Sequence, residues 1–80
     1  MNGQLMHDKA AEAILKTIQQ AAEPLETKEV EARVATFLKD VSRSRMIYRL
    51  QNLRAEGLVK GKFVGPGKGV WIWWNTYEKH

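Results

Sequence analysis

The sequence contains no cysteine, which excludes disulfide bonds, thiolate metal sites and cysteine nucleophiles. It also lacks any apolar run near the ~20 residues that a membrane-spanning helix needs. Its two histidines, His7 and His80, lie near the two ends without companions at metal-binding spacing. No nucleophile–base arrangement is visible either. We therefore expect a protein that is not an enzyme, holds no metal or cofactor and does not bind a membrane.

The remaining composition is that of one small globular domain. Of 80 residues, 44% are hydrophobic and 28% are charged, which is ordinary for a folded domain. We expect a single domain over residues 1–80 with an ordered core at about 8–75. The N-terminus has no basic-then-apolar leader pattern, which favours a cytoplasmic (nucleoid-associated) location.

Acidic residues are scarce in the second half of the sequence. Residues 1–40 contain five Lys/Arg and seven Asp/Glu, a net charge of −2, whereas residues 41–80 contain eight Lys/Arg and two Asp/Glu, a net charge of +6. Positive charge gathered in one part of a small domain favours a polyanionic partner. Charge alone is equally compatible with a solvated basic surface that has no partner.

Apolar residues at helical spacing predict three helices. We expect them over residues 8–22, 28–38 and 42–56. Their predicted N-caps are Asp8, Thr27 and Ser42. Gly57 stands where a left-handed residue ends a helix, and Pro24 begins a short extended link in which Leu25 points inward.

Two strands are predicted after the third helix, over residues 58–64 and 70–75, because both segments are rich in β-branched and aromatic residues. The intervening Gly-Pro-Gly-Lys-Gly segment, residues 65–69, predicts a tight turn with proline at its second and glycine at its third position. The order is helix, helix, helix, strand, turn, strand.

This order, with the run "SRSRMIYRLQNLRAEGLVKGKFVGPGKGVWIWW", resembles the winged-helix DNA-binding domain of small prokaryotic transcriptional regulators. The resemblance covers about residues 8–75 and is most specific where two serines open the third helix and Glu56-Gly57 leads into the hairpin. It implies an α+β winged helix-turn-helix fold, three helices followed by a two-stranded β-hairpin wing. It also implies that the third helix enters the major groove while the wing lies against the neighbouring DNA backbone or minor groove.

The third helix separates a packing side from a polar side. At ~100° per residue, Met46, Leu50 and Leu53 fall within a narrow arc that carries no charge. Arginine and amide side chains on the remaining surface suit base edges, and hydroxyls and cations at the helix start suit phosphates. We expect base contacts from Arg45, Tyr48, Arg49 and Asn52. We expect phosphate contacts from Ser42, Arg43 and Ser44.

An alternative for these arginines is left open. Arg45 and Arg49 could instead pair with acids of the second helix, such as Glu29 or Glu31. The DNA hypothesis depends on the outward side of the third helix being open to solvent with its cations free.

The hairpin adds three further cations, Lys60, Lys62 and Lys68, which we also expect to contact phosphates. Lysines on an exposed edge strand also prevent aggregation without any ligand, so this pattern has a second explanation.

The last strand carries three tryptophans, and alternation places Trp71 and Trp73 on one side and Trp74 on the other. One side must pack on the helices, and the other exposes aromatic surface unless residues 1–7 or 76–80 cover it. We name Trp71 and Trp73 as candidate partner contacts.

Two functions follow from the sequence. The first is a duplex-DNA-binding transcriptional regulator. The alternative is a winged-helix protein-interaction module in a larger complex that uses the tryptophan-rich strand. A homodimer through the first helix or this strand is left open.

Overall fold

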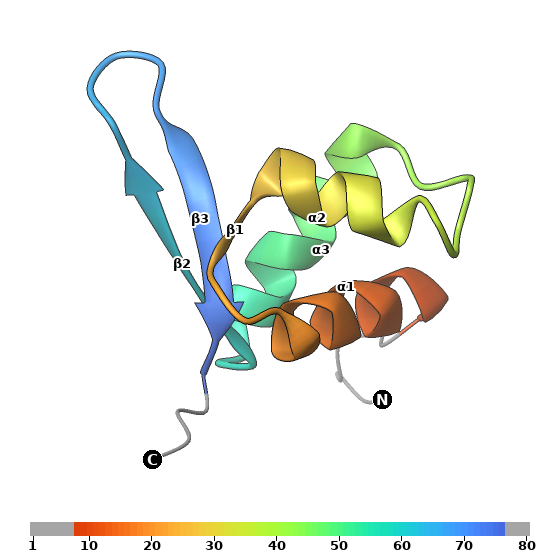
Figure 1. Cartoon of the computed structure of the whole chain (residues 1–80). Coiled ribbons are helices and arrows are strands. Elements are labelled where there is room, and N and C mark those ends of the chain that lie inside the picture. The colour runs from red at the N-terminus through yellow and green to blue at the C-terminus, as the bar shows by residue number, and fades with distance from the viewer. Residues whose placement is uncertain (1–7, 77–80) are drawn as a thin grey trace.

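A computed structural model describes residues 8–76, and its helices and strands follow the predicted order with one addition (Figure 1). The elements are α1 (Lys9–Gln20), β1 (Leu25–Glu26), α2 (Thr27–Val34), α3 (Arg43–Ala55), β2 (Val59–Val64) and β3 (Val70–Asn75). The addition is β1, a two-residue strand where we expected only an extended link. Residues 1–7 and 77–80, including both histidines, lie outside the described part of the chain.

The start of α1 is capped as predicted, because the Asp8 carboxylate accepts a hydrogen bond of 2.9 Å from the backbone N–H of Ala11. The helix ends at Gln20, earlier than expected. Its buried side, which includes Ile14 and Ile18, packs on the core.

The start of α2 differs from the prediction. Glu26, not Thr27, is the N-cap, and it forms a capping box with Glu29, whose carboxylate accepts from the Glu26 N–H at 2.8 Å. This frees the Thr27 hydroxyl to accept a hydrogen bond of 2.9 Å from the indole Nε1 of Trp73. The helix ends at Val34 rather than Leu38.

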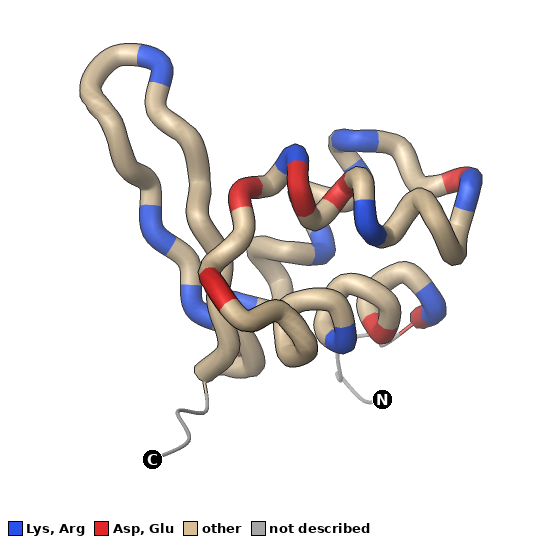
Figure 2. Tube along the Cα trace, in the orientation of Figure 1, with Lys and Arg blue, Asp and Glu red and all other residues tan. Residues whose placement is uncertain are grey.

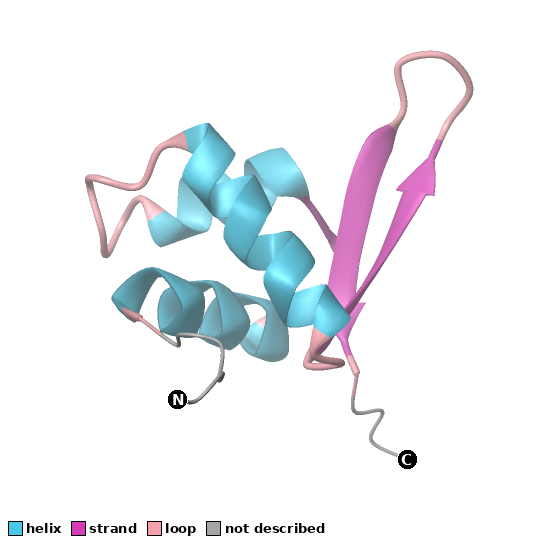
Figure 3. Ribbon diagram, turned by 180° about the vertical axis from the view of Figure 1, so that it is seen from behind, coloured by secondary structure: helices cyan, strands magenta, loops and turns pink. Residues whose placement is uncertain are grey.

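The third helix has the predicted limits. Ser42 accepts from the Arg45 N–H at 3.2 Å, and Gly57 has a φ of +80°, the left-handed conformation that closes a helix. Met46, Leu50 and Leu53 are buried. Figure 3, seen from behind, shows α3 in front of the other two helices, on the outside of the helical body.

The three strands form one antiparallel sheet in the order β1-β3-β2. In its register Leu25 lies opposite Trp73, which lies opposite Gly61. Trp73 is only 1% exposed and belongs to the core together with residues from all three helices. The hairpin extends beyond the helical body, while its base is packed against that body (Figure 1).

Candidate nucleic-acid interface

The outward surface of α3 is open to solvent. Ser42, Arg43, Ser44 and Arg45 are all exposed at the helix start, and the first turn contains no acidic residue. Tyr48, one turn further along, has 60% of its surface exposed. Hydroxyls, guanidinium groups and a phenol are therefore accessible around the amino end of a helix, where the helix dipole favours anions.

Arg45 keeps its guanidinium free of ion pairs within residues 8–76, and Asn52 is half-buried on the same side of α3. Both residues lie on the flank of α3 that faces the start of α1. There the Ala11 N–H, the Arg49 guanidinium and the nearby charge of Arg45 lower the pKa of Asp8 below its ordinary value of 3.8.

Arg49 corrects a prediction. Its guanidinium Nη2 donates to the carboxylate of Asp8, and its side chain is only 20% exposed. The guanidinium also lies 5.6 Å from the centre of the Tyr48 ring. We expected Arg49 to be open for base contact or paired with an acid of α2, but it is held against the N-cap of α1 through Nη2, and its Nε is buried without a hydrogen-bond partner among the described residues.

The acids of α2 reach only the start of α3. Arg43 Nη1 lies 3.7 Å from Glu31 Oε1, and both side chains are accessible to water. An exposed pair at this separation contributes little, so Arg43 stays available to an anionic ligand.

We did not predict from the sequence that the flank of α3 facing the hairpin would be part of this site. Here a cavity of about 190 Å³ lies between α2, α3 and β3, and Lys28, Arg43, Ile47 and Trp71 are among its lining residues. Further along the same flank, the Arg54 guanidinium lies 5.2 Å from the centre of the Trp71 ring. The signal was present in the sequence, since positions 43, 47 and 54 fall on one side of a helix.

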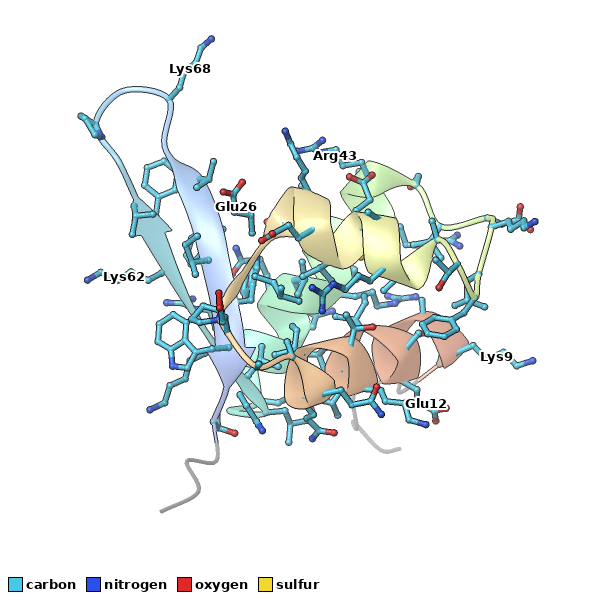
Figure 4. All side chains as sticks on the ribbon, in the orientation of Figure 1. Lys9, Glu12, Glu26, Arg43, Lys62 and Lys68 are labelled. Atoms are coloured by element: carbon cyan, nitrogen blue, oxygen red, sulfur yellow. The ribbon has the colours of Figure 1, made fainter. Side chains whose placement is uncertain are left out.

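The hairpin lysines do not share one surface. Lys68 stands at the turn, and its side chain extends outward from the tip of the hairpin in Figure 4. Lys60 and Lys62 lie opposite Trp74 and Ile72 on the sheet face turned away from the helices. Lys62 accordingly points away from the helical body in the same view. Lys68 is therefore at the tip of the hairpin, whereas Lys60 and Lys62 are on the outer face of the sheet. Figure 2 shows basic residues both on the hairpin and on the helical part of the molecule.

The two tryptophans named as partner contacts face the helices. Trp73 is buried and hydrogen-bonded to Thr27, so it has no surface to offer a partner. Trp71 is half-buried and stacks on Trp73 with ring centres 5.2 Å apart. This corrects our choice of face, and Trp74 is the tryptophan on the outer side of the sheet.

Within residues 8–76, no three His, Asp or Glu side chains are grouped so as to hold a metal ion. None of the helices described is long and apolar enough to cross a membrane.

No family model matches the sequence, and no curated protein matches it. Among solved structures, the chain is similar to the ferric uptake regulator Fur of Helicobacter pylori, whose structure is described as revealing three functional metal-binding sites. The TM-score is 0.78 at 17% sequence identity, and the match covers 95% of this chain and 49% of that one. The chain thus spans about half the length of the solved protein. At this identity the likeness concerns the fold, and it confirms the predicted α+β winged-helix architecture.

Proposed function

We propose that the protein binds duplex DNA and acts as a small transcriptional regulator, with α3 in the major groove and the hairpin turn against the backbone. The observation that carries the proposal is the open surface at the start of α3, where Arg45 and Tyr48 are exposed and the first turn has no acid. The winged-helix fold, found also in a transcriptional regulator, supports it.

The residues divide into two roles. Arg45, Tyr48 and Asn52 face base edges, since a guanidinium pairs with guanine and an amide with adenine. Ser42, Arg43, Ser44 and Lys68 hold phosphates and set the orientation of the helix. Arg49 is left out because Asp8 engages it, and Lys60 and Lys62 are left out because they lie on the far face of the sheet.

The proposal is tested by replacing Arg45 with alanine. Its side chain makes no ion pair in the described region, so the melting temperature should stay unchanged while affinity for a mixed-sequence duplex falls about tenfold. Fluorescence anisotropy with a labelled duplex measures the affinity, and circular dichroism measures the melting temperature.

Arg33→Ala is the matched control, because Arg33 is also an exposed helical arginine but lies on α2. Equal effects of the two variants, or no DNA binding by the unmodified protein, would overturn the proposal.

A further inference from the structure

The sheet has two edge strands, the two-residue β1 and the longer β2. Its order is β1-β3-β2, and among residues 8–76 β2 pairs with β3 alone, so the opposite side of β2 carries unpaired backbone N–H and C=O groups. The strand is six residues long and contains no proline. An edge of this kind accepts an additional strand.

The two faces beside this edge differ in chemistry. On the outer face Lys60 and Lys62 project next to Trp74 and Ile72 of β3. On the inner face Phe63 is 51% exposed and contacts Trp71 edge to face, with ring centres 6.1 Å apart. A strand added to β2 would therefore meet cations at alternate positions and apolar surface at the positions between them.

A hollow lies at the lower end of the edge. It has a volume of about 580 Å³, and Arg54, Lys60, Gly61 and Trp74 are among its lining residues. None of the residues that line it is acidic. Two cations beside an indole form a surface that favours a carboxylate together with an apolar side chain.

A second copy of the chain fits this edge poorly. Two β2 strands paired antiparallel about a twofold axis would place the Lys60 and Lys62 rows of both copies on the same side. Four ammonium groups would then face one another across the pair, and like charges directly opposite are destabilising. Charge complementarity calls for an acidic strand instead.

We propose that the free edge and outer face of β2 bind an extended segment of a partner protein in which acidic and apolar residues alternate. The acidic residues pair with Lys60 and Lys62, and the apolar residues pack toward Phe63. This surface uses Lys60, Lys62 and Phe63 of β2, none of which is among the residues proposed to contact DNA, so the interaction goes beyond DNA binding and does not depend on it.

The probe is a six-residue peptide of alternating Glu and Val, matched to the length of β2. It is titrated into the full chain and followed by amide NMR shifts. We expect shifts over β2 and at Ile72 and Trp74, with none over residues 42–52. A peptide with Lys in place of Glu should not bind. A peptide N-methylated at alternate positions, which cannot donate to the strand edge, should also fail to bind.

Lys60→Glu combined with Lys62→Glu should weaken peptide binding by about tenfold or more. The matched control is Lys9→Glu with Lys16→Glu, which changes the net charge equally on exposed positions of α1. Both double variants should retain the circular dichroism spectrum of the folded protein, because all four lysines are exposed.

The inference would be overturned if the Glu–Val peptide caused no shifts or if the Lys–Val peptide bound equally well. Equal losses of peptide affinity in the two double variants would also overturn it. So would sedimentation that shows a dimer of the unmodified protein and a monomer of the Lys60→Glu/Lys62→Glu variant. Duplex DNA that shifts β2 and the outer face of β3 would assign this surface to nucleic acid instead. The DNA proposal is tested by other measurements, namely NMR shifts in α3 and the DNA affinity of Arg45→Ala. Either proposal can therefore fail while the other stands.

Discussion

Asp8 has two partners that belong to different helices. Its carboxylate caps α1 through the Ala11 N–H and also holds the Arg49 guanidinium of α3. An asparagine caps a helix about as well as an aspartate, but it carries no charge to hold Arg49. Replacing Asp8 by asparagine therefore separates the two roles.

We expect Asp8→Asn to leave the fold intact and to tighten binding to mixed-sequence DNA. Releasing one guanidinium beside Arg45 adds about one phosphate contact, which makes the slope of log affinity against log salt more negative by about one. Anisotropy titrations at several salt concentrations measure both changes. Glu12→Gln removes the same charge from exposed α1 without touching Arg49, and matching effects of the two variants would contradict this role.

At the scale of elements, the hairpin packs against the core at Gly61 of β2, where there is no room for a side chain. A Cβ placed on Gly61 would lie 2.6 Å from ring atoms of Trp73, which is buried in the core. The ring cannot move aside easily, so Gly61→Ala should destabilise the protein by about 1–3 kcal/mol.

In a domain of this size each kcal/mol lowers the melting temperature by about 4–8 °C, which a thermal melt followed by circular dichroism resolves. Lys60→Ala, on the exposed neighbouring position, is the control and should melt near the unmodified protein. An unchanged melting temperature for Gly61→Ala would show that the close contact is relieved without cost.

The elements themselves could be predicted because their signals are local. The serine cap, the Met46, Leu50 and Leu53 spacing and Gly57 define α3 within sixteen neighbouring residues, and all were confirmed. Pairings between distant segments could not be predicted. Asp8 and Arg49 are 41 positions apart, and alternation leaves both faces of β3 equally apolar. The hairpin register held a usable clue, since it sets Gly61 opposite Trp73 and so leaves room for a large ring on that face.

Charge is unevenly distributed over the whole molecule, with −2 on residues 1–40 and +6 on residues 41–80. The two cations proposed to hold phosphates, Arg43 and Lys68, are exposed at the start of α3 and at the hairpin turn. Each phosphate contact contributes about −0.9 to the slope of log affinity against log salt.

We therefore expect a slope of about −2 for mixed-sequence duplex DNA, with a smaller magnitude in Arg43→Ala. Titrations between low and physiological salt measure it. A slope near zero would mean that phosphates do not drive binding, and this result would contradict the DNA proposal.

The hydrogen bond from Trp73 to Thr27, and the burial of that indole among side chains of all three helices, have a mechanical consequence. The base of the hairpin cannot swing relative to α3 without opening the hydrophobic interior, so the separation between α3 and this base is set before any ligand arrives. A rod-like ligand that does not match this separation must therefore bend or twist to fit, because the protein cannot adjust at low energetic cost.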